Sequence, residues 1–291
     1  MPQTRWRSSS WARIESSSST SSTRRLSRCA DRLSVLRIAG AGMAGLVAAA
    51  WARELGTRVV VFEKGDLAGG SMLLSSGVIW RHRTFAAFRQ ECPGGEPQLQ
   101  RLVFDELDAG LDWLESLGAE VTEGETGNER TVGRRFDTAE LTEALVRAAG
   151  DIRLRQPFSE ADVLATGGFG ARLARERGLL LRANSWSEGD GLAYALARGA
   201  GVSAGMDEFY GRNLPAAVPA DLFVLAAQLY GTHALVLDDE GREFFAGEPS
   251  WTETDLVQAT ARLPARAAWY VVDGRALRRR VRERTVAEIV E

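Results

Sequence analysis

The sequence has few of the residues that build metal sites and disulfides. Its 291 residues include only two cysteines and two histidines. Cys29, Cys92, His82 and His233 lie far apart in the sequence, whereas a protein metal site needs several ligands at short, regular spacings. We therefore expect no metal site and no structural disulfide. Unpaired cysteines favour a reducing compartment, and we predict a cytoplasmic protein.

Long apolar runs and a strong charge of one sign are also missing. The longest nearly uncharged apolar stretch, residues 38–52, is too short and too rich in glycine to predict a membrane span. The formal net charge is −3, from 36 basic and 39 acidic residues, and gives no electrostatic basis for binding nucleic acid. Arginines cluster over residues 275–284, which we interpret as the solvated face of one helix. We expect a small-molecule partner and neither nucleic acid nor a membrane span.

Residues 1–32 lack the acidic and apolar residues of a folded segment. They contain a run of serine and threonine and several arginines, but only two acids. Such a composition cannot bury a core. It resembles an organellar transit peptide, but we favour a disordered leader or an overextended start of the reading frame.

Spaced glycines after an apolar run are the most informative feature present. The largely apolar residues 35–39 precede Gly40, Gly42 and Gly45. In a strand followed by a helix, the first glycine allows a tight turn, the second lets a pyrophosphate touch the backbone, and the third lets the helix pack closely on the strand. Glu63 ends a second apolar run 18 residues after Gly45, near the spacing of about 20 at which a carboxylate reaches the ribose of a dinucleotide. The pattern predicts dinucleotide binding.

Periodicity and capping signals predict the elements around this turn. We expect a helix over residues 43–55, a strand over 57–62, an amphipathic helix over 98–117, a helix from the capping residue Asp137 to Ala149, and a short strand over 161–165. The apolar stripe predicted for the third of these consists of Leu99, Leu102, Val103, Leu107, Leu111, Leu114 and Leu117.

Three more glycine-containing segments follow Glu63, and their order along the chain is informative. They are residues 69–77, with a double glycine and serines, then residues 165–170, with Ala-Thr-Gly-Gly, then Gly189-Asp190-Gly191. With this succession the sequence resembles the flavoprotein superfamily of fumarate reductase, succinate dehydrogenase, aspartate oxidase and 3-ketosteroid dehydrogenase. The resemblance covers roughly residues 35–291. It implies an α/β fold: a three-layer, Rossmann-like FAD-binding domain with a parallel sheet, followed by a partial α+β cap domain.

The resemblance implies FAD as the cofactor and a set of residues that contact it. Glu63 would hold the adenosine ribose, Lys64 would flank the adenine side, and Asp190 would approach the ribityl or isoalloxazine end. The full set is Gly40, Gly42, Met43, Ala44, Gly45, Glu63, Lys64, Gly69, Gly70, Ser71, Ser75, Ser76, Gly77, Thr166, Gly167 and Asp190. The alternative for the serine hydroxyls is that they bond their own backbone.

Two departures from the superfamily pattern bear on the chemistry. Fumarate-reducing relatives carry a His-Pro-Thr element in the stretch matched here by residues 206–215, and this histidine is absent. Tyr210 and Arg212 are our catalytic candidates in that stretch, since a tyrosine can move a proton and an arginine can bind a carboxylate. A half-buried tyrosine and a surface arginine are the alternative. The β-meander expected between the last helix and the Ala-Thr-Gly-Gly strand is shortened near residues 152–161.

We therefore predict a disordered leader over residues 1–32, an FAD-binding domain over 33–214 and a partial cap or substrate domain over 215–291. The predicted function is a flavin-dependent dehydrogenase or reductase. It would transfer a hydride between FAD and a carbon next to a carbonyl or carboxylate of a small molecule, with an unidentified electron partner. Two alternatives stay open: an inactive FAD-binding or nucleotide-binding remnant, and an NAD(P)-dependent dehydrogenase with the same glycine motif.

Overall fold

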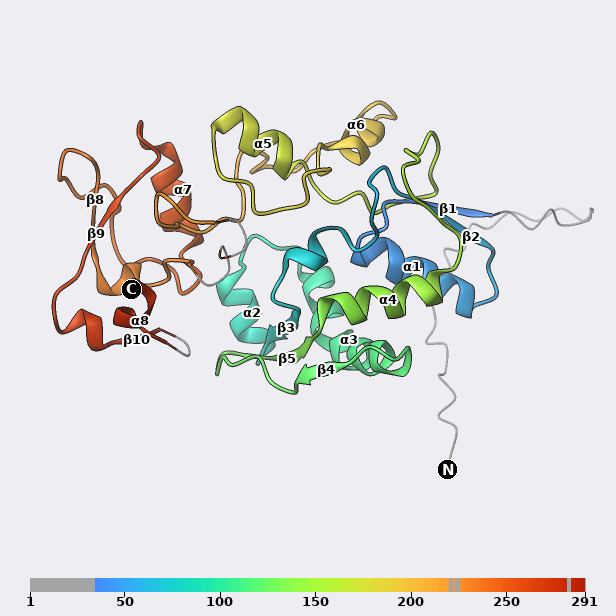
Figure 1. The fold of residues 1–291 in the computed structure, drawn as a ribbon, viewed down its shortest axis with the longest axis horizontal. Coiled ribbons are helices and arrows are strands. Elements are labelled where there is room, and N and C mark those ends of the chain that lie inside the picture. The colour runs from blue at the N-terminus through green and yellow to red at the C-terminus, as the bar shows by residue number, and fades with distance from the viewer. Residues whose placement is uncertain (1–34, 220–221, 223–225, 282–283, 291) are drawn as a thin grey trace, which may run out of the picture. The chain divides into compact units, whose positions relative to one another are not determined.

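A four-stranded parallel sheet organises the first part of the chain in this computed structural model (Figure 1). The structure describes residues 35–219, 222, 226–281 and 284–290, so the leader predicted over 1–32 lies outside the described residues. In the order of the sheet, the strands are β6 (Ile152–Arg153), β2 (Val59–Phe62), β1 (Leu36–Ala39) and β7 (Val163–Leu164). Their carboxyl ends share one edge, which is where α/β sheets bind ligands.

The first helix, α1 (Met43–Glu54), connects β1 to β2 as the sequence predicts. Leu46, Ala49 and Ala50 form its buried face, and the small alanines let it lie close to the sheet. The helix ends next to Gly56, whose positive φ of 84° reverses the chain into β2. The predicted β-α-β unit is confirmed.

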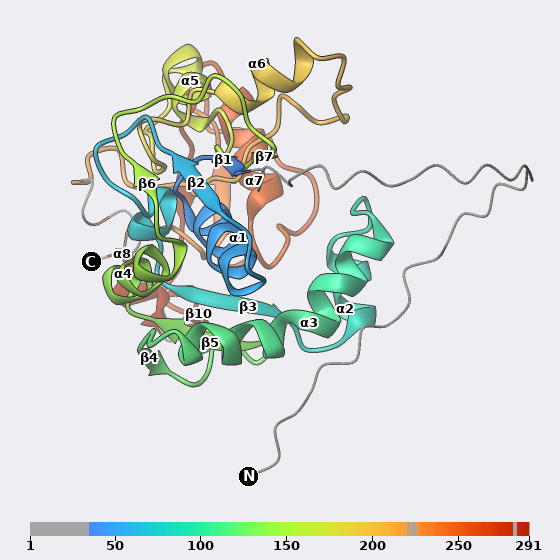
Figure 2. The same ribbon diagram turned by 90° about the vertical axis from the view of Figure 1, so that its right-hand side faces the viewer.

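A second helix, α4 (Thr138–Ala149), packs beside α1 (Figures 1 and 2). The Asp137 carboxylate accepts the backbone N–H groups of Ala139 and Glu140, both at 2.9 Å. This confirms Asp137 as the N-cap. Leu141 and Leu145 bury the inner face of the helix in the core that Ile38 and Val61 contribute from the sheet.

An antiparallel sheet of three strands follows in the order β3 (Val78–His82), β5 (Thr131–Phe136) and β4 (Val121–Glu123). Two helices, α2 (Phe85–Glu91) and α3 (Pro97–Ser116), lie beside it (Figure 2). Only the C-terminal half of α3 buries its predicted stripe, at Leu111 and Leu114. Leu99, Leu102 and Val103 are exposed.

The expectation of a continuous buried stripe on α3 is therefore wrong for its first turns. The N-terminal half of α3 meets the short helix α2 through Phe104, whose ring lies 5.7 Å from the ring of Phe85. Arg101 stacks on the same Phe85 ring at 3.7 Å. Helical periodicity gives an apolar face but does not say how far the partner surface extends.

The connection between β6 and β7 consists of residues 154–162, all of which are described and none of which is in a strand. After β7 come α5 (Gly170–Arg177) and α6 (Asp190–Leu196). In Figures 1 and 2 these two helices lie on the side of β1 and β2 opposite α1 and α4. The α/β fold with a parallel sheet is confirmed.

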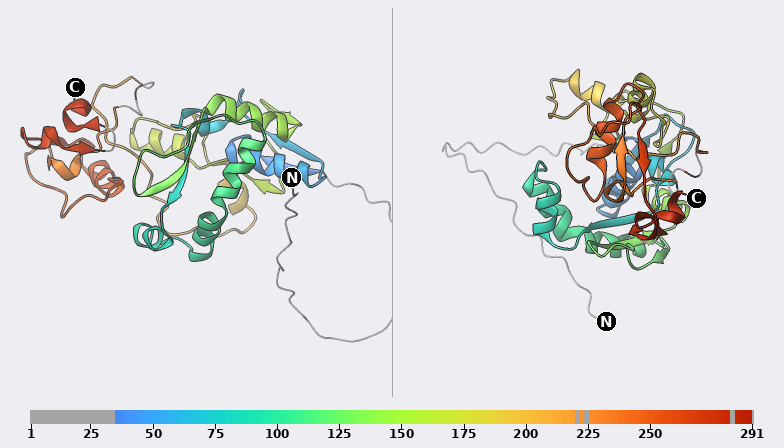
Figure 3. Two further views of the ribbon diagram at one scale, coloured as in Figure 1. Left: turned by 90° about the horizontal axis from the view of Figure 1, so that it is seen from below. Right: turned by 90° about the vertical axis from the view of Figure 1, so that its left-hand side faces the viewer.

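The C-terminal segments, orange to red in Figure 3, form a second small core around Tyr230, Val286 and Ile289. Their elements are η3 (Gly231–His233), β8 (Leu235–Leu237), α7 (Thr254–Arg262), β9 (Trp269–Val271), η4 (Ala276–Arg278), β10 (Arg280–Val281), β11 (Arg284–Thr285) and α8 (Val286–Val290). Strands β8 and β9 pair antiparallel, as do β10 and β11. A domain division at residue 214 stays a prediction.

The arginine cluster does not form the single helix that we expected. Asp273 accepts the N–H groups of Arg275 and Ala276 and starts one short 3₁₀ turn, η4. The chain then continues into the β10–β11 hairpin, while Arg282 lies outside the described residues. The arginines leave too few apolar positions to bury a longer helix.

Among the helices that the structure describes, none has the length and apolar character needed to cross a membrane.

Candidate functional site

Three glycines shape the turn from β1 into α1, each for a different reason. Gly40 has a φ of 101°, and a Cβ there would lie 2.4 Å from the carbonyl oxygen of Ala165. A Cβ on Gly45 would lie 1.9 Å from the carbonyl oxygen of Gly40. A Cβ on Gly42 would meet no atom within 4 Å, because this residue faces a cavity. The turn and the close helix packing predicted from the glycine spacing are therefore present.

Glu63 ties the end of β2 to this turn. Its side chain is buried, with 9% of the residue exposed. One carboxylate oxygen, Oε2, accepts the N–H of Ala41 at 2.9 Å, and the other, Oε1, accepts the N–H of Gly65 at 2.8 Å. Each oxygen keeps a second lone pair. The carboxylate is thus fixed in place and can still accept hydrogen bonds from hydroxyl groups.

The second glycine segment joins the first turn directly. The N–H of Gly69 donates to the carbonyl of Ala41 at 2.8 Å, and a short 3₁₀ helix, η1 (Gly70–Leu74), follows. Two serine hydroxyls here contact backbone: Ser75 Oγ donates to the Met72 carbonyl at 2.8 Å, and Ser71 Oγ accepts the Asn184 N–H at 3.1 Å. These contacts order the loop.

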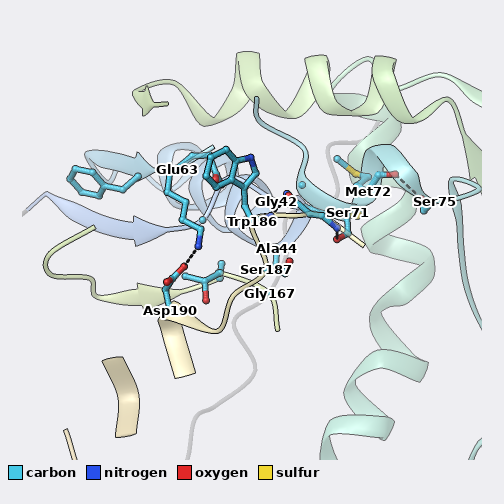
Figure 4. A pocket seen from close by; sticks show the side chains of 18 of the residues that line it. Gly42, Ala44, Glu63, Ser71, Met72, Ser75, Gly167, Trp186, Ser187 and Asp190 are labelled. Atoms are coloured by element: carbon cyan, nitrogen blue, oxygen red, sulfur yellow. Dashed lines mark hydrogen bonds and ion pairs between the residues drawn. The ribbon is translucent and has the colours of Figure 1, made fainter. Parts of the chain in front are cut away.

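The third and fourth segments meet at the edge of β7. A Cβ on Gly191 would lie 2.2 Å from Thr166 Oγ1, so α6 begins directly against the Thr166-Gly167 turn. The ammonium group of Lys64 forms an ion pair with the Asp190 carboxylate (Figure 4). We expected Lys64 and Asp190 to serve different halves of the cofactor, whereas the structure brings them into contact.

These segments enclose one cavity of about 760 Å³ (Figure 4). The predicted cofactor residues that line it are Gly40, Gly42, Met43, Ala44, Glu63, Lys64, Gly70, Ser71, Ser75, Gly77, Thr166, Gly167 and Asp190. Gly45 and Gly69 do not line it and act through backbone packing. Ser76 lines a neighbouring cavity. Four glycine-containing segments far apart in the sequence thus form a single site.

Several lining residues were missed in the sequence analysis. Their side chains are mostly apolar or aromatic, and all except Met72 lie outside the four glycine-containing segments: Phe62, Met72, Val78, Ile79, Pro157, Phe158, Asn184, Trp186, Ser187 and Tyr194. One overlooked signal concerns Lys64, which is the single lysine of the chain. Because lysine occurs only once in the sequence, its place directly after Glu63 marks this position.

Tyr210 and Arg212 line the neighbouring cavity, which has a volume of about 1230 Å³ and shares Ser71 and Ser75 with the first. The Arg212 guanidinium donates to the Thr252 carbonyl at 3.0 Å, to the Gly211 carbonyl at 2.9 Å and to the Tyr210 hydroxyl. Tyr210 is 72% exposed. The two catalytic candidates therefore lie together, at the wall of the second cavity.

A buried carboxylate behind this wall was also missed. Glu253 is 3% exposed and has a φ of 54°, in the left-handed region that few non-glycine residues adopt. Its Oε1 accepts the Gly231 N–H at 2.7 Å, and its Oε2 has no hydrogen-bond partner among the residues that the structure describes. Burial raises the pKa of Glu253 to about 7, although Arg212 favours the charged form.

Neither histidine lines either cavity. His82 is buried next to the rings of Trp80, Phe88 and Trp251, with centroids 5.2 to 6.0 Å away. Burial lowers the pKa of His82 below its usual value, so the ring is neutral at neutral pH. His82 is therefore a core residue of the fold.

The residues of the first cavity fit a dinucleotide with a pyrophosphate. Gly42 leaves open space at the N-terminus of α1, and no described side chain caps that terminus. The positive end of the helix is thus free to bind phosphate oxygens. Gly70 approaches from the other side, where a Cβ would lie 3.2 Å from the Cα of Gly42.

Comparison with known proteins gives the same answer for the fold and the cofactor. A family model described as FAD binding domain matches residues 36–162, and no curated protein matches the chain. Among solved structures, a flavocytochrome c3 fumarate reductase shares 19% identity with a TM-score of 0.57, covering 81% of this chain and 52% of that chain.

Two steroid dehydrogenases are similar as well. The 3-ketosteroid-delta4-(5alpha)-dehydrogenase from Rhodococcus jostii RHA1 shares 15% identity with a TM-score of 0.60, covering 82% of this chain and 66% of that one. The 3-ketosteroid delta1-dehydrogenase from Sterolibacterium denitrificans shares 16% with a TM-score of 0.53, covering 82% and 68%. The chain spans about half of the fumarate reductase and two thirds of the dehydrogenases. Residues 36–162 are thus similar to an FAD-binding domain, the chain shares the fold of these flavoproteins, and the comparison indicates FAD as the cofactor.

Proposed function

We propose that the protein is a flavin-dependent oxidoreductase that transfers a hydride between FAD and a carbon next to a carbonyl or carboxylate of a small molecule. The observation that carries this proposal is the junction of the two cavities at Ser71 and Ser75. A small molecule in the second cavity would lie next to the serine loop that lines the cofactor cavity. Such contiguity is what transfer between a bound cofactor and a substrate requires.

The residues of the chain would bind and orient the reactants. When bound, FAD supplies the two-electron chemistry that amino-acid side chains lack. Gly42 and the N-terminus of α1 would hold the pyrophosphate, and the Glu63 carboxylate would accept hydrogen bonds from the ribose hydroxyls. Ser71 and Ser75, held by backbone contacts, would fix the loop at the junction of the cavities.

In the second cavity we assign Tyr210 to proton transfer and Arg212 to binding the carbonyl or carboxylate oxygen. Three hydrogen bonds fix the guanidinium next to the phenol, and a guanidinium matches the geometry of a carboxylate. Proton transfer is favoured in a dry site, and Tyr210 is 72% exposed, so a bound substrate would have to shield its hydroxyl from water.

The first experiment is to purify the full chain and record its absorbance. We expect the visible bands of oxidised flavin, and FAD in the supernatant after heat denaturation. A colourless protein that gives no heat on titration with FAD would contradict the proposal. A colourless protein that binds NAD⁺ instead would favour the nicotinamide-dependent alternative.

The second experiment tests Glu63. Glu63→Ala should weaken FAD binding about 10-fold to 100-fold, because hydrogen bonds to a charged group contribute roughly 1.5–3 kcal/mol. Glu63→Gln keeps an acceptor for the Ala41 N–H and separates folding from ribose binding. Glu106→Ala, at an exposed position on α3, is the control. Unchanged affinity in both Glu63 variants would refute the assigned role.

The third experiment measures turnover of carbonyl compounds with an artificial electron acceptor. Tyr210→Phe should lower the rate about 100-fold if Tyr210 moves a proton, with FAD binding unchanged. Full activity of Tyr210→Phe would show that Tyr210 does not transfer the proton and is only a surface residue. Bound FAD without turnover of any compound would favour the alternative of a cofactor-binding protein that has no enzymatic activity.

A further inference from the structure

Four aromatic side chains line the cofactor cavity and belong to no glycine motif. Phe62 is the last residue of β2, Phe158 lies in the connection after β6, Trp186 lies in the loop before α6, and Tyr194 lies on α6. The carboxylate of Glu63 and the ammonium of Lys64 line the same cavity. An aromatic group next to a ribose-binding carboxylate suits a planar base.

The connection after β6 is fixed to the residues that follow β2. The N–H of Gln156 donates to the carbonyl of Glu63 at 2.9 Å, and the N–H of Arg155 donates to the carbonyl of Gly65 at 2.8 Å. These two bonds place the next residues, Pro157 and Phe158, at the cavity. A connection without any strand thereby contributes an aromatic wall.

Phe158 is held by a second aromatic residue. Its ring lies 5.2 Å from the ring of Tyr194, at an interplanar angle of 65°. The Tyr194 hydroxyl accepts the N–H of Ala161 at 3.3 Å, and the guanidinium of Arg198 stacks on the Tyr194 ring at 3.4 Å. The position of Phe158 is therefore supported by α6 as well as by its own loop.

Trp186 lies against the backbone of the segment after Glu63 (Figure 4). A Cβ on Gly65 would lie 3.0 Å from Cδ1 and 3.1 Å from Nε1 of the indole. The Trp186 backbone N–H donates to Asn184 Oδ1 at 2.9 Å, which orders the loop. The residue is nevertheless 47% exposed, so the described residues leave much of the largest apolar side chain in the cavity uncovered.

We propose that Trp186 and Phe158 bind the adenine ring of FAD, so that the cavity recognises the ADP half of the cofactor largely without the flavin. The proposal rests on the assignment of FAD and names the residues that select it. Stacking of a base on an aromatic side chain contributes about 1–3 kcal/mol. Adenosine diphosphate alone should therefore bind, and flavin mononucleotide, which lacks adenosine, should bind poorly.

The test is a calorimetric titration of the full chain with ADP, FAD, flavin mononucleotide and NAD⁺. We expect FAD and ADP to bind and flavin mononucleotide to bind at least 10-fold more weakly than ADP. Binding of FAD without binding of ADP would overturn the inference but leave the flavin function intact. If neither binds, both the inference and the proposed function fail. Binding of NAD⁺ as tight as that of FAD would support adenine recognition and count against the flavin function.

Variants test the two aromatic residues. Trp186→Ala and Phe158→Ala should each weaken ADP binding about 5-fold to 150-fold, the range that corresponds to 1–3 kcal/mol, and Trp186→Phe should retain part of the affinity. Trp51→Ala is the matched control, since Trp51 is 48% exposed and packs on Trp113 outside the cavity. If Trp186→Ala binds ADP as tightly as the Trp51 variant does, the role of Trp186 is refuted.

The single lysine supplies a second measurement. An amine-acetylating reagent can modify only Lys64 and the terminal amino group, because the chain has no other lysine. We expect ADP and FAD to slow acetylation of Lys64 about 10-fold, as measured by peptide mass spectrometry, and flavin mononucleotide to leave it unchanged. The terminal amine is the internal control. Acetylation of Lys64 at the same rate with bound ADP would place the nucleotide elsewhere and overturn the inference.

Discussion

The cofactor cavity and the C-terminal segments are built by different means. Backbone forms the first: the turns at Gly40, Gly42 and Gly70 leave space where side chains would stand. Side chains form the second, where Asn213 donates to the Tyr270 hydroxyl at 2.8 Å and Glu253 is buried behind Arg212. The family model for an FAD binding domain matches residues 36–162. This range includes the first two glycine turns and Glu63 but not the C-terminal segments.

The two regions tolerate different changes. A site made by backbone depends on the absence of Cβ atoms, and one added methyl group meets main-chain atoms that cannot move aside. A site made by buried polar side chains depends instead on protonation and on complete hydrogen bonding. Burial also raises the pKa of Tyr270 well above its usual range, so this phenol stays protonated. The first region should thus be sensitive to sterics and the second to pH.

The largest effect is expected for Gly45→Ala in the first region. The new Cβ would lie 1.9 Å from the Gly40 carbonyl oxygen, so α1 must move away from the turn. We expect the free energy of unfolding to fall by at least about 3 kcal/mol, the upper end for added core atoms, as measured by urea denaturation. Gly110→Ala on α3, where a Cβ meets no atom within 4 Å, is the control and should stabilise slightly. Equal stability of both variants would contradict the steric account.

Next in size is the pH dependence of the second region. Glu253 ionises near pH 4.5 in the unfolded chain and near pH 7 in the folded one, so between these values the folded state holds the extra proton. Stability therefore falls by roughly 3 kcal/mol as the pH rises from about 4.5 to 7, and it is level above that. Glu253→Gln should remove this part of the pH dependence in urea denaturation, whereas Glu248→Gln, at an exposed position, should keep it.

A smaller effect is expected for Asp137→Ala, at the start of α4. The variant removes the acceptor for the N–H groups of Ala139 and Glu140 and should cost about 1 kcal/mol of stability. Glu143→Ala, on the exposed face of the same helix, should change thermal unfolding much less. Comparable losses in both variants would mean that charge, and not capping, stabilises the helix.

The smallest effect is expected for Leu102→Ala on α3. Leu102 is exposed, whereas Leu111 on the same helix is buried. Leu111→Ala should cost about 3 kcal/mol, and Leu102→Ala less than about 0.5 kcal/mol. Thermal unfolding of the two variants side by side checks this. A large loss for Leu102→Ala would show that the N-terminal half of α3 is covered in solution.

Much of the cofactor cavity could be predicted because its constraints are local. Gly40, Gly42 and Gly45 act through the backbone of a single turn, and Asp137 caps the helix that it precedes. The aromatic wall could not be predicted, because Trp186 and Phe158 meet the cavity only after separate loops have folded against Glu63 and Gly65. The exposure of Leu102 could not be predicted either, because it depends on where the surface that packs against α3 ends.

By itself, the sequence determined the β-α-β turn, the position of the Glu63 carboxylate at the end of β2 and the kind of cofactor, since glycines without side chains and a carboxylate at a fixed spacing act on nearby backbone. Only the tertiary structure decided that Lys64 and Asp190 pair, that Ser71 and Ser75 join two cavities, and that Glu253 is buried with a raised pKa. Those outcomes depend on which distant segments exclude water from one another, and residue spacing does not encode that.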